Sequence, residues 1–216
     1  MKLSLRTIAT LPCLAALLAI AGTAHAASIV NGLFSSPITT GWSQTGSGTT
    51  PGNHITIITL GTANDTGFGD TVPLDGSITN AAYFVDDNAH TENLSQTLSL
   101  AANTTYTVTF DLFGVASGDT NKFDDSLTAS IGGVSKGFFD FTTQSWTGES
   151  LVFTTGAAGN YDLTFAFDAG PTPAKDIALT NVAITSPVPE PTSLALFGTG
   201  ILGLAGVAKR KFLARS

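Results

Sequence analysis

Cysteine is almost absent from the 216-residue sequence, which contains a single one, Cys13. Cys13 lies within the N-terminal 26 residues, which are assigned below to a signal peptide, and it lacks the flanking pattern of a lipoprotein signal. The mature chain therefore contains no cysteine. It forms no disulfide, and it has neither a thiol nucleophile nor a thiolate metal ligand.

Positive charge is scarce between residues 27 and 188, where three lysines and no arginine stand against fifteen aspartates and glutamates. Such an acidic surface disfavours nucleic acid and anionic lipid headgroups as partners. It suits a calcium ion, which takes oxygen ligands. A solvated acidic surface on an exported protein explains the same composition without a cation, and both interpretations stay open.

Amphipathic helices of useful length are also missing from this region, where apolar and polar residues alternate instead. The alternation is clearest at 106–112 and 161–167, and it predicts that Phe110, Phe165 and Phe167 are buried, as is Phe153 in a third segment. Further strands are predicted at 54–60, 94–100, 126–131, 149–154 and 177–185. Because turn-forming residues separate these segments, the sequence predicts an all-β fold, a single antiparallel β-sandwich over residues 27–186. Strands 106–112 and 161–167 are expected inside its sheets.

The first 26 residues have the composition of a secretory signal peptide. Lys2 and Arg6 form a basic start, and residues 8–21 form an apolar centre. Ala24-His25-Ala26 is a small-x-small cleavage site. This order predicts export and a mature chain that begins at Ala27.

Residues 187–216 combine three features in order: a Pro-Glu-Pro motif, an apolar run and a basic tail. The motif at 188–193 begins with Val188-Pro189-Glu190-Pro191, whose prolines favour extended backbone. The uncharged run at 193–208 is slightly shorter than the roughly 20 residues that a membrane-spanning helix needs. The tail at 209–216 contains Lys209, Arg210, Lys211 and Arg215. The long basic side chains of the tail reach the lipid headgroups, which makes a short membrane span workable. Basic residues beside an uncharged run also favour a tail on the inner side of the membrane. Both features disfavour the alternative of a buried C-terminal helix.

This order of parts resembles the PEP-CTERM sorting signal of Gram-negative bacteria. The resemblance implies processing by an exosortase, a membrane-embedded cysteine protease or transpeptidase, near Pro189-Glu190-Pro191. It further implies a precursor anchored transiently in the inner membrane, with its ectodomain in the periplasm. The processed form is then expected at the cell surface or in an exopolysaccharide matrix.

A second pattern consists of strand openings within the ectodomain. It comprises Asn31-Gly32-Leu33-Phe34, Gly41-Trp42, the segments 94–98 and 106–110, and the closing strand 177–184. This pattern resembles the galactose-binding-domain-like jelly rolls, which include many carbohydrate-binding modules. In that family an acidic residue after the opening motif and an aspartate in the closing strand often hold a structural calcium. Ser35 and Asn181 occupy those positions here, which departs from the family's ligand set.

Catalytic and cofactor motifs are absent: the sequence has no G-x-S-x-G, phosphate-binding loop or dinucleotide fingerprint. His54 and His90, the histidines of the mature chain, lack a metal-ligand spacing. Neither Asp86-Asp87 nor Asp124-Asp125 forms an acid–base couple alone, because neighbours on a strand point to opposite faces. A couple assembled from different strands stays open, so a glycan-active enzyme remains the least favoured function class.

One acidic loop offers candidate metal ligands, namely Asp119, Asn121, Asp124 and Asp125. Calcium accepts oxygen ligands from a flexible loop, although the spacing is not that of an EF-hand. A turn capped by Asp and Asn side chains explains the same residues without an ion. We therefore expect no cofactor, with this loop as the candidate site for structural calcium.

Glycan binding requires an exposed aromatic ring beside polar groups that take sugar hydroxyls. Trp42, Tyr83 and Trp146 are the candidate rings. Both tryptophans lie among small polar residues, which favours partial exposure. A tryptophan that plugs one end of the sandwich core fits the same surroundings.

Together these features predict an exported, non-catalytic surface or matrix protein that associates with exopolysaccharide. The alternative is a structural or adhesive surface protein that has a protein partner and no sugar site.

Overall fold

The computed structural model describes residues 27–47, 55–62, 71–85, 90–115, 126–139, 144–169, 176–186 and 200. The segment His25–Pro187 forms a compact unit of its own, and every strand described below belongs to it.

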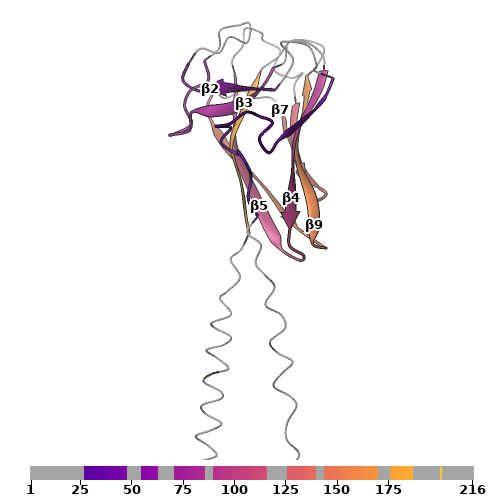
Figure 1. The fold of residues 1–216 in the computed structure, drawn as a ribbon. Helices are drawn as coiled ribbons and strands as arrows, with labels where there is room; N and C mark the ends of the chain where they lie inside the picture. Colours follow the sequence, from indigo (N-terminus) through magenta and orange to yellow (C-terminus); the bar gives the residue numbers. More distant parts are fainter. Residues whose placement is uncertain are drawn as a thin grey trace, which may run out of the picture. The chain divides into compact units, whose positions relative to one another are not determined.

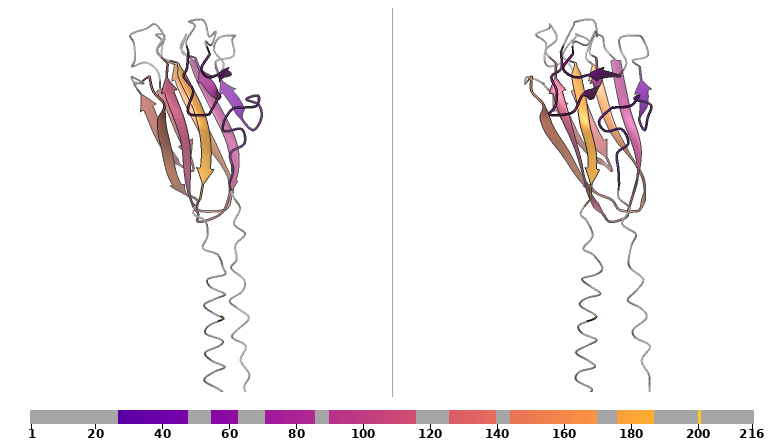
Figure 2. Two further views of the ribbon diagram at one scale, coloured as in Figure 1. Left: turned by 90° about the vertical axis from the view of Figure 1, so that its left-hand side faces the viewer. Right: turned by 60° about the vertical axis from the view of Figure 1, so that its left-hand side comes forward.

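The described residues contain ten strands in two five-stranded sheets, and the paired strands are antiparallel. The strands are β1 (Ser43–Gly46), β2 (Thr56–Thr59), β3 (Asn80–Phe84), β4 (His90–Leu100), β5 (Thr105–Gly114), β6 (Ser126–Ile131), β7 (Val134–Phe139), β8 (Thr147–Thr154), β9 (Gly159–Ala169) and β10 (Ile177–Thr185). The first sheet has the order β1-β4-β9-β6-β7, and the second has the order β2-β3-β10-β5-β8. Figure 1 shows β4 and β9 in one layer and β5 in the other, and Figure 2 shows the same sandwich from two more sides. The predicted antiparallel β-sandwich is confirmed.

The core between the sheets is built from the alternating apolar residues that the sequence indicated. Phe110, Phe153, Phe165 and Phe167 are all buried, as predicted. The rings of Phe110 in β5 and Phe165 in β9 meet at 5.0 Å and 82°, an edge-to-face contact between the two sheets. Burying such a side chain contributes about 2–3 kcal/mol of transfer free energy. Both strands also have neighbours on each side, so they lie inside their sheets as expected.

Strand boundaries agree closely where the alternation is regular. The predicted strands 126–131 and 177–185 match β6 and β10, whereas β4 begins four residues before the predicted strand at Leu94. Strands β1, β3 and β7 were not predicted. The hairpin between β6 and β7 turns at Gly132 and Gly133, whose φ angles of 59° and 81° suit a tight two-residue turn.

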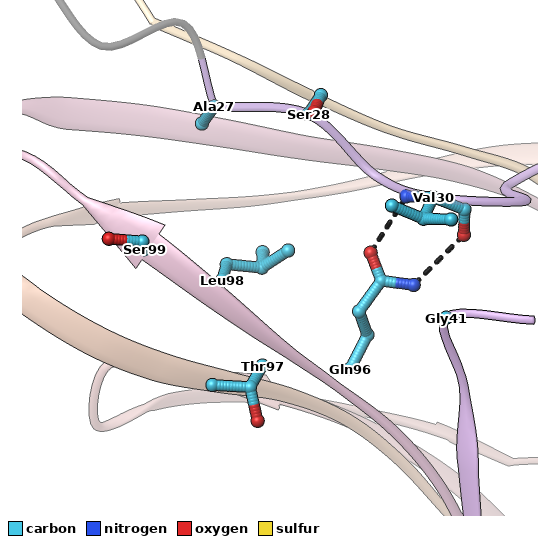
Figure 3. A pocket seen from close by; sticks show the side chains of 8 residues that line it. All are labelled: Ala27, Ser28, Val30, Gly41, Gln96, Thr97, Leu98 and Ser99. Atoms are coloured by element: carbon cyan, nitrogen blue, oxygen red, sulfur yellow. Dashed lines mark hydrogen bonds between the residues drawn. The ribbon is translucent and has the colours of Figure 1, made fainter.

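The N-terminal residues 27–34, called the strap below, link the two sheets. On one side the Val30 N–H donates to Gln96 Oε1 at 2.8 Å, and Gln96 Nε2 donates to the Val30 carbonyl at 2.9 Å (Figure 3). On the other side the Val182 N–H donates to the Gly32 carbonyl at 3.0 Å. Gln96 belongs to β4 and Val182 to β10, so the strap hydrogen-bonds to both layers.

The second sheet carries another apolar cluster on its outer face. In β5 the side chains of Val108, Phe110 and Leu112 point into the core between the sheets, so Phe113 points outward. The buried members of the outer cluster are Ile58, Leu60, Val72, Ala81, Tyr83, Val85, Phe113, Val115 and Ala178. Residues 71–79, called the cover below, contribute Val72 to this cluster and pack Ile78 against it.

Candidate functional site

The candidate site lies on the outer face of β5 and β8, beside the cover. Asp111 and Phe113 occupy successive outward positions of β5, and Gly148 of β8 pairs with Asp111. Trp146, just before β8, packs against Phe113 with ring centroids 5.4 Å apart and planes at 49°. Trp146 is half-buried, so part of its ring faces solvent.

A hydrogen bond fixes the orientation of this indole. Trp146 Nε1 donates to the carbonyl oxygen of Pro73 in the cover at 3.0 Å. A partly buried tryptophan usually pairs its N–H in this way, which leaves the ring as an apolar surface. The bond to Pro73 and the contact with Phe113 together hold the ring in one position.

Beside the indole, Asp111 has a partner from β10. Asn181 Nδ2 donates to Asp111 Oδ2 at 2.6 Å. Asn181 has a φ of 53° and lies where the pairing of β10 with β5 shifts register, so a bulge directs its side chain toward β5. Gly148 keeps the space next to Asp111 open, because a Cβ at that position would lie 3.2 Å from Asp111 Oδ1.

Asp75 of the cover meets the same carboxyl group. Burial, a hydrogen bond with Asp111 and repulsion from the Asp111 charge raise the pKa of Asp75 to about 6. Asp75 Oδ2 is enclosed, and no donor among the described residues reaches it. Two ionised carboxylates have no proton to share, so this hydrogen bond requires one of the two to be protonated, and the raised pKa assigns the proton to Asp75.

The site therefore combines a fixed aromatic ring, an amide and a carboxyl pair on an open sheet face. Sugar hydroxyls both donate and accept hydrogen bonds, and amides and carboxyls match them. The pair Asp75–Asp111 does not have glycosidase geometry, because catalytic carboxyls flank the scissile bond at about 5 Å or more. Carboxyls in hydrogen-bond contact leave no space for a sugar between them.

Two of the three predicted glycan-binding residues need correction. Trp42 is 4% exposed, and it packs between Phe34 at 5.6 Å and Phe165 at 6.1 Å. Its Nε1 donates to the Asn31 carbonyl at 3.2 Å. Tyr83 is fully buried and donates its hydroxyl to Asp176 at 2.7 Å. Neither ring offers a face to a ligand, since both have apolar neighbours and satisfied polar atoms.

Several predicted residues lie outside the described part of the chain. They are the candidate calcium ligands Asp119, Asn121, Asp124 and Asp125, the sorting residues Val188, Pro189, Glu190 and Pro191, the basic residues Lys209, Arg210, Lys211 and Arg215, and the cleavage-site residues Ala24 and Ala26. Within the described ranges, no three His, Cys, Asp or Glu side chains gather as metal ligands do.

His90, which the sequence predicted to be no metal ligand, lies with Glu92 on the inner face of β4, and Glu92 was not singled out from the sequence. His90 is 7% exposed and Glu92 is 6% exposed, and the His90 ring packs on Phe167 at 5.8 Å. Burial raises the pKa of Glu92 to about 7, although a hydrogen bond from the Ile55 backbone opposes this shift. Extending the alternation backwards from Leu94 would have placed both residues on the buried face.

A cavity of about 310 Å³ lies beside the strap, lined by residues that include Ala27, Val30, Gln96 and Leu98. Figure 3 shows that the Gln96 amide turns to Val30. Because both polar atoms of that amide are already bonded to backbone, this cavity has less to offer a ligand than the outer face of β5 and β8.

Comparison with known protein families identifies the C-terminal segment. Residues 187–211 match the PEP-CTERM protein-sorting motif. The chain carries a PEP-CTERM sorting motif. The resemblance of this segment to the sorting signal is thereby confirmed, and the motif marks a secreted, sorted protein. Among the described residues no helix is long and apolar enough to cross a membrane. The predicted span at 193–208 lies outside the description, except for Gly200.

Solved structures similar to this chain include carbohydrate-binding-module-like β-sandwiches. One is TmCBM61 in complex with β-1,4-galactotriose, with 14% identity, a TM-score of 0.49, and coverage of 72% of this chain and 95% of that one. Another is a CBM4 structure, with 19% identity, a TM-score of 0.42 and coverage of 73% and 99%. A third is the K3 adhesin domain of Lys-gingipain from Porphyromonas gingivalis, with 17% identity, a TM-score of 0.48 and coverage of 74% and 98%. At these identities the likeness concerns the fold alone. A search among curated proteins finds no match.

Proposed function

We propose that the chain is an exported, non-catalytic protein of the cell surface or extracellular matrix that binds a neutral exopolysaccharide. The binding surface is the outer face of β5 and β8. The observation that carries the proposal is Trp146, a partly exposed ring fixed beside Asp111 and Asn181 in a chain with a sorting motif at 187–211.

The export route follows from the two ends of the chain. The signal peptide, residues 1–26, leads the chain through the inner membrane. The apolar run at 193–208 then anchors the precursor, with the ectodomain in the periplasm. An exosortase cuts near Pro189-Glu190-Pro191 and releases the protein to the surface or the matrix. This route delivers the domain to the compartment in which exopolysaccharide accumulates.

The charge of the domain favours a neutral glycan over an anionic one. Fifteen acidic residues and three lysines between residues 27 and 188 create a negative field, which repels uronic-acid or phosphate-bearing polymers. At the site itself Asp111 adds a further acceptor, and Asn181 presents a neutral amide. Neutral sugars satisfy these groups through hydroxyls, and their C–H faces stack on the indole.

The direct test measures binding of residues 27–187, which lie within one compact unit, to the neutral exopolysaccharide of the producing strain. We expect saturable binding that Trp146→Ala weakens about tenfold or more, since a central aromatic contact is worth upward of about 1.4 kcal/mol. Val134→Ala on β7 is the matched control, because Val134 is 39% exposed and belongs to the other sheet. The same affinity is expected in calcium and in EDTA.

Four results would redirect the proposal. Equal affinities for wild type and Trp146→Ala would place the glycan elsewhere on the domain. Absence of binding would favour the structural or adhesive alternative with a protein partner. Turnover of the polysaccharide by the purified domain would contradict the non-catalytic assignment. Loss of binding in EDTA would assign a calcium ion to the loop of Asp119, Asn121, Asp124 and Asp125.

A further inference from the structure

The base of the cover is attached firmly to the second sheet. The Val72 side chain is fully buried in the outer cluster, and the Gly61 N–H donates to the Val72 carbonyl at 2.7 Å. At the other end of the cover, the Leu60 N–H donates to the Thr79 carbonyl at 2.8 Å. These contacts use backbone atoms and an apolar side chain, so they do not respond to pH.

The tip of the cover, residues 74–78, is attached to the sheet by different contacts. Ile78 N–H donates to the Asp75 carbonyl at 2.9 Å, and Gly76 has a φ of 57°, so residues 75–78 form a tight turn. Leu74, next to this turn, is 52% exposed and adds little burial. Across to β5, the tip makes its polar contact through the Asp75 side chain, which meets Asp111. A segment with little buried apolar surface opens locally at low free-energy cost.

We propose that residues 71–79 are a pH-operated cover, closed when Asp75 and Asp111 share a proton and loosened when both carboxyls are ionised. In the closed form Asp75 donates its proton to Asp111, while Asn181 donates to Oδ2 of the same carboxylate. Loss of the proton leaves two negative charges in contact, and the enclosed Asp75 Oδ2 has no donor among the described residues to stabilise the new charge. The repulsion and the buried charge both act against the closed position.

The surroundings of Asp75 contain nothing described that would cancel this repulsion. From β5 it meets Asp111, and the neighbours of Asp111 are Asn181 of β10 and Gly148 of β8, neither of which titrates. The described lysine, Lys136, is bonded to Glu149, whose strand position turns it to the opposite side of the sheet. The charge balance at the tip therefore depends on Asp75 and Asp111.

The direction of the pH effect follows from the raised pKa of Asp75, which moves from 3.8 to about 6. Below pH 3.8 the group is protonated whether or not the cover is closed, and the closed form has its full stability. As pH rises through about 6 the closed form loses its shared proton. Because the open form releases this proton near pH 3.8 and the closed form near pH 6, each pH unit between these values shifts the equilibrium toward the open form by at most about tenfold, and above about pH 6 it levels off.

Opening of the cover changes the candidate site because the cover holds the indole. Trp146 Nε1 is bonded to Pro73, two residues from Asp75. The closed cover keeps the ring positioned for a ligand, and a loosened cover gives it rotational freedom that binding must remove. Glycan affinity is thus expected to be higher at pH 5 than at pH 8, a consequence that rests on the proposed function. The cover itself does not depend on that function.

Trp146 provides the readout. The chain has two tryptophans, so Trp42→Phe leaves Trp146 as the sole indole. Its fluorescence is expected to change with a midpoint near pH 6. Iodide should quench this fluorescence more strongly at pH 8, because the indole ring is then more accessible. Asp75→Asn, whose amide still donates to Asp111, should abolish the transition. Asp162→Asn, an exposed carboxyl on β9, should leave it in place.

A second measurement guards against a folding defect of Trp42→Phe. Hydrogen exchange of the unaltered chain, corrected for the intrinsic pH dependence, should reveal lower protection of the Ile78 amide at pH 8 than at pH 5. Amides of β9 should keep equal protection. The absence of a transition in both measurements, or its survival in Asp75→Asn, would overturn the pH-operated cover.

Binding of the neutral exopolysaccharide at the two pH values separates this proposal from the proposed function. A fluorescence transition without glycan binding at either pH would support the cover and reject the glycan site. Equal glycan affinities at pH 5 and pH 8, with no transition, would reject the cover and keep the glycan site. Tighter binding at pH 5 than at pH 8 in the wild type, together with equal affinities at the two pH values in Asp75→Asn, would support both proposals.

Discussion

Glu92 is an acidic side chain on the inner face of a strand whose other inward residues are mostly apolar. It is 6% exposed, two residues from the equally inward His90. Burial penalises its charged form, which raises its pKa from 4.5 to about 7 even though the Ile55 N–H bonds to it. At the residue scale, this carboxyl links the stability of the core to pH.

The sign of that link can be tested with Glu92→Gln. Because the folded state raises the pKa, its contribution to stability is complete below pH 4.5 and is lost as pH rises through about 7. The thermal midpoint of the wild type should therefore fall from pH 5 to pH 8, and Glu92→Gln should flatten this fall. Asp168→Asn, at an exposed position of β9, is the control and should keep the wild-type slope. If the thermal midpoint of Glu92→Gln falls between pH 5 and pH 8 as steeply as that of the wild type, Glu92 is not the group that links stability to pH.

Trp42 and Trp146 illustrate what single residues reveal before the fold is known. Both lie among small polar residues in the sequence, yet Trp42 is enclosed by Phe34 and Phe165, whereas Trp146 stays half-buried beside Phe113. The difference arises from partners distant in sequence, so local composition could not separate the two environments. The contact of Asp111 with Asp75 and Asn181 also joins three distant segments, and no spacing rule predicts it.

At the scale of elements, predictability depended on how many faces of a strand are buried. Strand β9 and residues 105–111 of β5 bury one face, so their alternation was visible. Strand β3 buries both faces, because the outer cluster lies over one of them, and β1 is exposed at every position. Neither strand alternates, which is why the pattern missed them.

The strap contains Gly32, a position that has no space for a side chain. A Cβ on Gly32 would lie 2.0 Å from the Val182 carbonyl oxygen, a backbone atom that cannot move alone. Gly32→Ala should therefore detach the strap from β10 and lower the free energy of unfolding by about 3 kcal/mol. Gly156→Ala, whose Cβ would meet nothing within 4 Å, should stay within about 0.5 kcal/mol of the wild type. Urea unfolding of residues 27–187 gives both values, and equal midpoints for the two variants would contradict this role of the strap.

At the scale of the whole molecule, the sandwich is one part of a chain that also carries a sorting motif. The sorting motif at 187–211 was recognisable from sequence because it depends on order and composition and not on tertiary contacts. The candidate site, by contrast, depends on contacts between the cover, β5, β8 and β10. Sequence therefore predicted the sorting motif and the β-sandwich, whereas the candidate site required the structure.

Replacement of Pro189-Glu190-Pro191 by alanines tests the sorting route in the producing strain. We expect the full-length precursor to accumulate in the membrane fraction, because the processing enzyme no longer recognises its motif. Pro37→Ala, an exposed substitution within the ectodomain, should be processed normally. Normal release of the triple-alanine variant would contradict exosortase processing at this motif.

The most direct measurement of glycan binding follows the two indole N–H signals of residues 27–187 by NMR during titration with neutral exopolysaccharide oligomers. Trp146 and Trp42 give one signal each, and Trp42 serves as an internal control because it is 4% exposed. We predict that the Trp146 signal shifts in a saturable manner while the Trp42 signal stays in place. A titration in which the Trp146 signal does not move, although the oligomers bind, would contradict the assignment of the glycan to the outer face of β5 and β8.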